Sequence, residues 1–493
     1  MRLLLVLVFS FICTPAAFAN SYLIQYDSNC RQAYHAYMRL QTKAGDAFLG
    51  SEQKSLPNNL SAVYIADYKD CLQMLFNANA GYFAQIKPHI DERIKLLELG
   101  PKDNEWYRVY KAGIYWHWAL MYFRLGEQLK AALYFRKAYL LMKDNEKDYP
   151  NFSYNQVYLS LCEILLGSLP ENYKWIAATL GYKGNVNKGA TLMNQFLQQH
   201  KPGDLLYDEA QIYYAYILFY FKQQKEAAYN YIMINDFADH ENLTALFVKC
   251  NIALNFRKAE QAINMLKPIC NELLLKEYPI IYFELGSAYF YRSDTNCQYY
   301  FQQFLVNYRG SAFIKETWLM LAHSYYLQNK LPQANYCKQM IIKAGNALTD
   351  ADKHALRFAN GELWPQQKIL QAHILTDGGY YNKALIILLT AKEADFQQLA
   401  DKAEYWLRLG RVYEELNENE KALNCYFLAI ARGKFLPNYF AARAALQSAY
   451  IYEKQQNTNE AVKAYKQVLN MPAHDYQSSL DQQAKAGLSR LYE

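Results

Sequence analysis

One pattern of small and aromatic residues recurs along most of this chain and limits what the chain can fold into. The pattern is clearest in residues 406–429, which read WLRLGRVYEELNENEKALNCYFLA. Residues spaced i, i+3, i+4 and i+7 mark one face of a helix: Trp406, Leu409, Gly410 and Tyr413. After the polar turn NENE, a second helical face is marked by Ala422, Tyr426 and Ala429. Because Gly410 and Ala422 are small, we expect the paired helices to approach closely there.

The same frame recurs at intervals close to the length of one helical hairpin. Its small residue falls at positions 119, 215, 250, 286, 322, 372, 410 and 449. Most of these positions lie 35–39 residues apart, and the two longer intervals, before 215 and before 372, hold extra residues. The pattern resembles the tetratricopeptide repeat, whose period is about 34 residues. The resemblance implies an all-α protein: an α-α superhelix, or solenoid, of about eight or nine such hairpins.

Breaks in the frame suggest how the chain is divided. Residues 20–100 show no repeat and read as a helical hairpin broken at Pro57, whose first arm, 30–53, is predicted to be one long helix. We expect this hairpin to be an N-terminal helical cap, because an uncovered repeat would expose its apolar face. The predicted segments are a signal peptide at 1–19, the cap at 20–100, hairpins with an insertion (166–193) at 101–205, repeats at 206–343, a helical insertion or linker at 344–367, and C-terminal repeats at 368–493.

The insertion at 166–193, LGSLPENYKWIAATLGYKGNVNKGATLM, is rich in glycine. Gly184 and Gly189 have the spacing of a phosphate-binding loop, but Ala190 stands where that loop needs lysine, and a helix is predicted where a strand should precede it. A helix–helix connection is therefore favoured over a nucleotide site. The segment also resembles the inclusion-body clearance family, which includes tetratricopeptide repeat protein 39. The matching residues are Pro170, Gly181, Tyr182, Gly184, Asn185 and Gly189.

The resemblance to that family extends to the last repeat, 439–491, and implies a helical-repeat interaction protein without catalytic residues. Tyrosine-rich repeats together with an export signal also resemble proteins of Gram-negative bacteria of the Bacteroidota type. The export signal is the N-terminal MRLLLVLVFSFICTPAAFAN, a short apolar run followed by small residues. We predict cleavage after Ala19 and a periplasmic or secreted protein. A lipoprotein anchored at Cys13 is disfavoured because bulky Phe11 and Ile12 precede that cysteine.

Charge, cysteine and histidine patterns narrow the class of function. The net charge of +6 is spread without a basic run, which predicts no nucleic-acid partner. After the N-terminal apolar run, no segment has the ~18 apolar residues of a membrane span. Eight widely spaced cysteines follow Cys13, and buried free thiols are favoured over disulfides, with Cys250 and Cys270 as the best candidate pair. No metal or cofactor motif occurs. His323 and His373 share one repeat position, either as a pH-sensitive pair or as two unrelated residues of the groove.

The sequence is compatible with two functions. The first is a non-catalytic scaffold or adaptor that holds a partner protein or peptide in a helical-repeat groove. The alternative is a secreted helical-toroid enzyme acting on glycans, or a glycan-binding protein, suggested by aromatic-rich helices and export. That enzyme would need two acidic side chains converging on one cavity.

The groove residues are predicted from the repeat register, since the first helix of each hairpin lines the concave face. The predicted binding residues are Trp116, Phe123, Tyr216, Phe219, Phe283 and Phe290. Corresponding positions in the C-terminal repeats are partly charged, as Arg411, Glu414 and Glu453 show. An aromatic groove suits the apolar face of a partner helix. The alternative is that these aromatic side chains are covered from within, by the N-terminal hairpin or by the 344–367 insertion.

Overall fold

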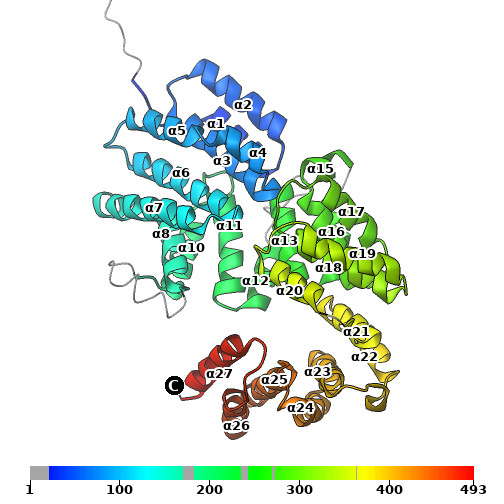
Figure 1. Ribbon diagram of the computed structural model, residues 1–493. Coiled ribbons are helices and arrows are strands. Elements are labelled where there is room, and N and C mark those ends of the chain that lie inside the picture. Colours follow the sequence, from blue (N-terminus) through cyan, green and yellow to red (C-terminus); the bar gives the residue numbers. More distant parts are fainter. Residues whose placement is uncertain (1–20, 170–182, 235–241, 269–271, 362, 493) are drawn as a thin grey trace, which may run out of the picture. The chain divides into compact units, whose positions relative to one another are not determined.

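The computed structural model describes residues 21–169, 183–234, 242–268, 272–361 and 363–492 (Figure 1). Within these ranges the regular secondary structure is helical, apart from an isolated bridge between Leu23 and Asn59. The all-α prediction is confirmed. The chain divides into two compact units, each described here by itself. Unit 1 contains residues 1–75 and 81–214, and unit 2 contains 76–80 and 215–493.

Unit 1 begins with five helices that precede the first repeat-like hairpin. They are α1 (Ser28–Met38), α2 (Thr42–Ser55), α3 (Leu60–Asn77, whose last two residues belong to unit 2), α4 (Ala80–Ile86) and α5 (His89–Glu98). The helices that follow are α6 (Glu105–Arg124), α7 (Gln128–Asp148), α8 (Asn155–Gly167), α10 (Val186–Gln199) and α11 (Tyr207–Tyr216, whose last two residues belong to unit 2). They are drawn in blue to green in Figure 1.

The prediction of one long helix over 30–53 is wrong, because the chain turns between α1 and α2. Leu40 adopts φ 58°, a left-handed conformation that ends a helix. The amide of Gln41 then donates to the carbonyl of Ala36 at 2.8 Å, which closes the end of α1. The phenol of Tyr37 donates to Asp46 at 2.8 Å and fixes α2 against α1. A leucine at the turn gives no glycine signal in the sequence, so the break could not be read from it.

Unit 2 continues the alternation of paired helices. Its earlier elements are η1 (Ile217–Phe221), α12 (Lys225–Ile234), α13 (Leu243–Asn255), α14 (Ala259–Leu266), α15 (Glu272–Glu277), α16 (Ile280–Tyr291), α17 (Cys297–Asn307), α18 (Ile314–Leu327) and α19 (Leu331–Lys343). Its later elements are α20 (Asp350–Asn360), α21 (Gln367–Asp377), α22 (Tyr381–Leu389), η2 (Glu393–Asp395), α23 (Leu399–Glu415), α24 (Asn419–Gly433), α25 (Phe440–Lys454), α26 (Thr458–Leu469) and α27 (Gln477–Tyr492).

Consecutive helices pack in pairs along the described chain. The pairs are α6/α7, α8/α10, η1/α12, α13/α14, α16/α17, α18/α19, α21/α22, α23/α24 and α25/α26. Two small residues of the frame, Gly410 and Gly286, lie where their helix pairs make close contact. At Gly410 an added Cβ would stand 2.6 Å from the ring of Tyr426 on α24, and at Gly286 it would stand 2.6 Å from Phe301 on α17. The repeat-like helical solenoid is therefore built on the contact that the small–aromatic frame predicts.

The segment predicted as an insertion at 344–367 holds helix α20. Thr349 and Asp352 form a reciprocal capping box at its start. Ala355 and Ala359 pack against Leu319 of α18 and Ile341 of α19 in a common apolar cluster. The helix therefore covers the α18/α19 hairpin.

Candidate functional site

The first helices of the hairpins in unit 1 do not present an open aromatic surface, because α3 packs against them. Tyr64 of α3 stacks on Tyr110 of α6, with ring centroids 4.7 Å apart. Its hydroxyl also lies 2.9 Å from that of Tyr158 on α8. On α1, Tyr34 donates a hydrogen bond to Glu209 of α11 at 2.6 Å. The chain's own N-terminal helices therefore cover residues on α6, α8 and α11.

The six predicted binding residues fall into three environments. Four are buried, with exposed fractions of 8% or less: Trp116, Phe219, Phe283 and Phe290. Tyr216 is half-buried beside Tyr220, and Phe123 is 67% exposed. Trp116 and Phe123 belong to unit 1 and the other four to unit 2, so the structure does not place all six on one described surface. Contact with a partner stays a prediction for all six.

The buried members pack on aromatic residues of their own neighbourhood. Trp116 lies 6.2 Å from Phe135 of the paired helix α7, measured between ring centroids. Phe283 lies 5.4 Å from Phe304 of α17 and 5.1 Å from Phe313. Side chains at these positions can pack inside a hairpin as well as line a groove. The repeat register alone does not distinguish a core position from a groove position.

A buried polar network in unit 1 was not predicted from the sequence. Asp67 of α3 has no exposed surface and accepts hydrogen bonds from three side chains. They are Arg93 at 2.8 Å, His117 at 2.8 Å and Trp118 at 3.0 Å. Arg93 also bonds Asp70 at 2.6 Å. An Asp–His pair is a familiar catalytic arrangement, but His117 is only 1% exposed, so its imidazole is almost closed off from solvent. The network locks α3 to α5 and α6.

The described part of the glycine-rich insertion serves packing. An added Cβ on Gly189 would stand 2.8 Å from the carbonyl oxygen of Ser160 on α8, and the hydroxyl of Ser160 donates to the Gly189 carbonyl at 2.7 Å. Lys188 is paired with Glu163 at 2.6 Å. Gly189 therefore lets α10 approach α8 closely, as expected for a helix–helix connection. Pro170, Gly181 and Tyr182 lie outside the described residues.

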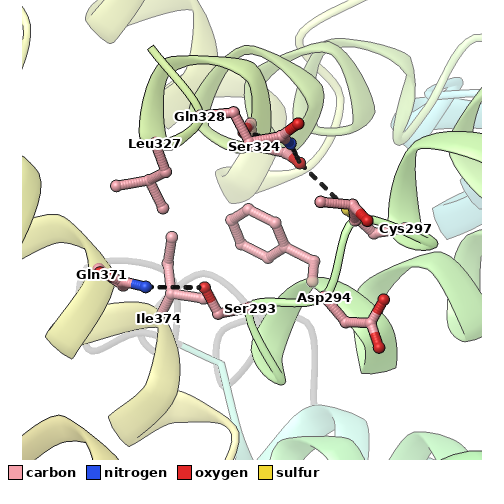
Figure 2. A pocket seen from close by; sticks show the side chains of 10 residues that line it. Ser293, Asp294, Cys297, Ser324, Leu327, Gln328, Gln371 and Ile374 are labelled. Atoms are coloured by element: carbon pink, nitrogen blue, oxygen red, sulfur yellow. Dashed lines mark hydrogen bonds between the residues drawn. The ribbon is translucent and has the colours of Figure 1, made fainter.

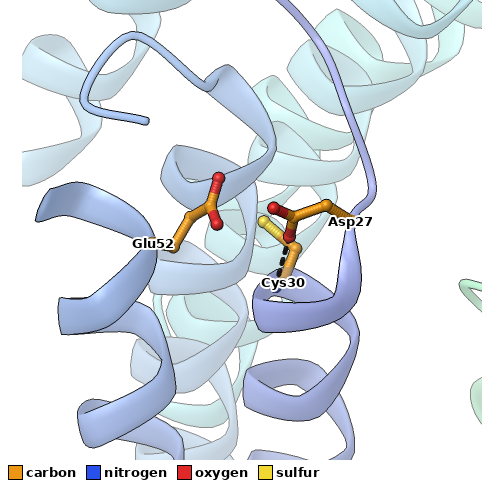
Figure 3. A group of neighbouring side chains, drawn as sticks. All are labelled: Asp27, Cys30 and Glu52. Carbon is orange, nitrogen blue, oxygen red and sulfur yellow. Dashed lines mark hydrogen bonds between the residues drawn. The ribbon is translucent and has the colours of Figure 1, made fainter. Parts of the chain in front are cut away.

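Three side chains of unit 1 gather at the start of α1 in a pattern that could hold a cation (Figure 3). The ligand atoms of Asp27, Cys30 and Glu52 lie within 4.8 Å of one another. The amide of Asn59, however, donates to Glu52 at 2.7 Å and to Cys30 at 3.6 Å. Burial raises the pKa of the Cys30 thiol and of the Glu52 carboxyl, which favours their protonated forms. Hydrogen bonding therefore accounts for this cluster without a metal.

A small cavity of about 110 Å³ lies among α16, α17, α18 and α21 of unit 2 (Figure 2). Cys297 donates its thiol hydrogen to Ser324 at 3.3 Å, and Gln371 donates to Ser293 at 3.3 Å. Burial raises the pKa of Cys297 to about 12. The cysteine is therefore a thiol rather than a reactive thiolate. The cavity has room for a few water molecules and holds no activated nucleophile.

The predicted histidine pair becomes a group of three in unit 2. His354 of α20 joins His323 and His373, and the ring of His323 packs 5.1 Å from Phe358. Burial, helped by the two neighbouring histidines, lowers the pKa of His323 to about 3. His373 is paired with Asp377 at 3.2 Å. His323 is therefore neutral at physiological pH, and it is held by packing.

Two glutamates of unit 2 have raised pKa values. Glu284 is 4% exposed, and burial raises its pKa to about 7, although Asn251 donates a hydrogen bond to it at 2.9 Å. Burial, together with nearby Asp352 and Glu284, raises the pKa of Glu316 to about 8. Raised carboxyl pKa values are a property of glycosidase acids. With so little of Glu284 exposed, however, this side chain cannot reach a glycan.

The C-terminal repeats carry charged side chains at register positions where the earlier repeats carry aromatic ones. Arg411 and Gln447 converge on Glu414, at 2.9 Å and 3.0 Å, and the phenol of Tyr426 donates to the same carboxylate. Arg408 is held by Glu404 at 2.8 Å. Arg411 and Glu414 of α23 are therefore linked to Gln447 of α25 in one polar surface, whereas Glu453 of α25 pairs with Arg490 of α27.

Arg443 of α25 differs from the other arginines of this surface. Within the ranges that the structure describes, its guanidinium has neither an acidic partner nor a hydrogen bond. Burial, with Arg411 and Arg408 nearby, lowers the pKa of Arg443. Its side chain is half-buried. Nothing in the repeat register distinguished this residue beforehand.

The described cysteines are buried free thiols: Cys30, Cys71, Cys162, Cys250, Cys297, Cys337 and Cys425. Cys270, the candidate partner of Cys250, lies outside the described residues. Among the described helices, none has both the length and the apolar character that crossing a bilayer requires.

Comparison with known proteins adds little to this architecture. No family profile and no curated protein matches the sequence. Among solved structures, the chain is similar to a chain of the APC/C hetero-tetramer Cut9–Hcn1, at 12% identity and a TM-score of 0.26, over 94% of this chain and 95% of that one. A chain of Naa15/Naa10 bound to HypK-THB is matched at 13% identity and a TM-score of 0.21, over 94% and 78%. TM-scores this low carry no argument, so the fold rests on the helix pairs described above.

Proposed function

We propose that this protein is an exported, non-catalytic scaffold that binds a partner protein or peptide on the helices of its C-terminal repeats. The observation that supports this proposal is the polar surface of α23 and α25, where half-buried arginines and glutamates are held in defined positions. Fixed, partly exposed charges favour specific recognition of another protein. The aromatic residues of unit 1 are less suited to this role because α1 and α3 already cover much of their surroundings.

A protein partner fits the charge pattern better than a nucleic acid does. Acidic residues alternate with the arginines on α23, and Glu404, Glu414 and Glu415 would repel a phosphate backbone. Export is inferred from the N-terminal sequence, and an interaction role agrees with the resemblance of 166–193 to the inclusion-body clearance family. No cofactor or metal is required by this proposal.

Site-specific photo-crosslinking tests the binding surface. A benzophenone amino acid at Tyr450, half-buried on α25, should crosslink a defined partner in native envelope extract. The matched control is Lys463 on the second helix, α26, whose side chain is 72% exposed. A third position, Leu133 on α7, is 61% exposed and has exposed Leu129 one turn away. Equal crosslinking from Tyr450 and Lys463, or crosslinking from Leu133 alone, would contradict the proposal.

A further inference from the structure

The starting observation is the pairing of the arginines on the α23/α25 surface. Arg408 pairs with Glu404, and Arg411 pairs with Glu414 and Glu415. Farther along, Arg490 pairs with Glu453 at 2.9 Å. Arg443 is the exception among these described arginines, because no acidic side chain of the described ranges reaches it. Its guanidinium therefore keeps its full capacity for donating hydrogen bonds.

The surroundings of Arg443 make this lack of a partner costly. Arg411 and Arg408 lie near this half-buried guanidinium, and the glutamates that pair with those two arginines form no ion pair with Arg443. An arginine cannot escape this cost by losing its proton, because its guanidinium stays charged in proteins. A carboxylate placed against it would remove the repulsion and supply two parallel hydrogen bonds.

The polar groups beside Arg443 already have partners. Tyr439 and Tyr450 both lie near Arg443, and the hydroxyl of Tyr439 accepts a hydrogen bond from Arg408 at 3.1 Å. Gln447, one turn further along α25, is already held by Glu414. An incoming acidic side chain would thus meet a guanidinium that no described acid pairs with, while the neighbouring Gln447 and Tyr439 are already occupied.

We propose that Arg443 binds the side-chain carboxylate of an acidic peptide segment in the partner protein, on the surface formed by α23 and α25. This inference rests on the proposed scaffold function and specifies the chemistry of its partner. A single free guanidinium matches a single carboxylate. A run of nucleic-acid phosphates would meet the repelling glutamates of α23.

Fluorescence anisotropy with a defined probe tests the proposal. The probe is an acidic decapeptide, EALAEALAEA-amide, labelled with fluorescein at its N-terminus, and its analogue carries glutamine in place of each glutamate. Arg443→Gln should weaken binding of the acidic peptide at least 10-fold and leave the weak binding of the analogue unchanged. Arg443→Lys keeps the charge but loses the two-pronged geometry, so its affinity should be intermediate.

The control variant is Arg432→Gln, which also removes one positive charge but lies on α24 and is paired with Glu393. It should leave the affinity within about 2-fold of wild type. Because Arg443 has no side-chain partner among the described residues, Arg443→Gln should melt no lower than wild type, which separates lost binding from lost folding. Equal losses in both variants would reduce the effect to net charge and overturn the inference. A single-stranded oligonucleotide serves as a second probe. If Arg443→Gln loses binding of the oligonucleotide but keeps binding of the acidic peptide, the inference is also overturned.

Crosslinking from Tyr450 separates this inference from the scaffold proposal. If the Tyr450 crosslink forms and survives Arg443→Gln, the scaffold proposal stands and the role of Arg443 is wrong. If no crosslink forms even with Arg443 intact, the scaffold proposal itself fails.

Discussion

Replacing Gly410 with alanine tests the packing on which the solenoid rests. The new Cβ would stand 2.6 Å from Cε1 and 2.7 Å from Cδ1 of Tyr426, far inside van der Waals contact. Tyr426 is fully buried, and its hydroxyl is anchored on Glu414, so the ring has little freedom to move away. Overpacking of this kind costs about 1–3 kcal/mol. Alanine recovers about 1 kcal/mol of helix propensity. We expect a net destabilisation of up to about 2 kcal/mol.

Gly50 of α2 provides the matched control, because it is also a helical glycine and an added Cβ would meet nothing within 4 Å. Gly50→Ala should stabilise α2 by about 0.5–1 kcal/mol. Since the chain has two units, the assay should be local: native-state amide hydrogen exchange in α23 and in α2. Faster exchange in α23 of Gly410→Ala and slower exchange in α2 of Gly50→Ala are expected. If both variants protect their helices equally, the close approach at Gly410 does not exist.

Three further predictions concern the buried acid, the thiols and the N-terminus. Burial raises the pKa of Glu284 to about 7, so the folded state holds this proton more tightly than the unfolded state. The contribution of this proton to the free energy of unfolding is fully present below pH about 4.5. It is lost as the pH rises through 7. Glu284→Gln should remove up to about 3 kcal/mol of the stability decline between pH 5 and 9 in denaturant titrations, and an unchanged decline would contradict the assignment. The seven described thiols should react with Ellman's reagent only upon unfolding, and dithiothreitol should leave the melting temperature unchanged; a lowered melting temperature would indicate a disulfide. N-terminal sequencing of the native protein should begin at Asn20, and a start at Met1 or a lipid-modified Cys13 would refute cleavage after Ala19.

The helix pairs could be predicted from the sequence because the residues that form each pair lie close together along the chain. A small residue and an aromatic residue that meet across a hairpin are fewer than 20 positions apart, as Gly410 and Tyr426 are. The break at Leu40 could not be predicted, since a left-handed leucine leaves no mark in composition. The cover that α3 places on the first hairpins was open as an alternative, but Tyr64 and Tyr158 are 94 positions apart and no periodicity links them.

The candidate site shows the same division between local and long-range information. The charged positions at Arg411 and Glu414 were predicted from repeat register, and their mutual ion pair is local because both lie on α23. The lack of a partner at Arg443 could not be predicted. It depends on which acids of α23 are already occupied by other arginines, and that depends on side-chain geometry across two hairpins.

The contrast between the two kinds of first-helix surface follows from the physics of burial. Covering an aromatic ring such as Tyr64 or Tyr110 removes apolar surface from water and is favourable at about 25 cal/mol per Å². A permanent cover is therefore stable in unit 1. Covering Arg443 with an apolar helix would bury a charge without a partner, which costs several kcal/mol. The chain can stably close its aromatic surface with its own helices. A protein segment that covers Arg443 must place an anionic side chain against its guanidinium. This requirement favours an acidic partner.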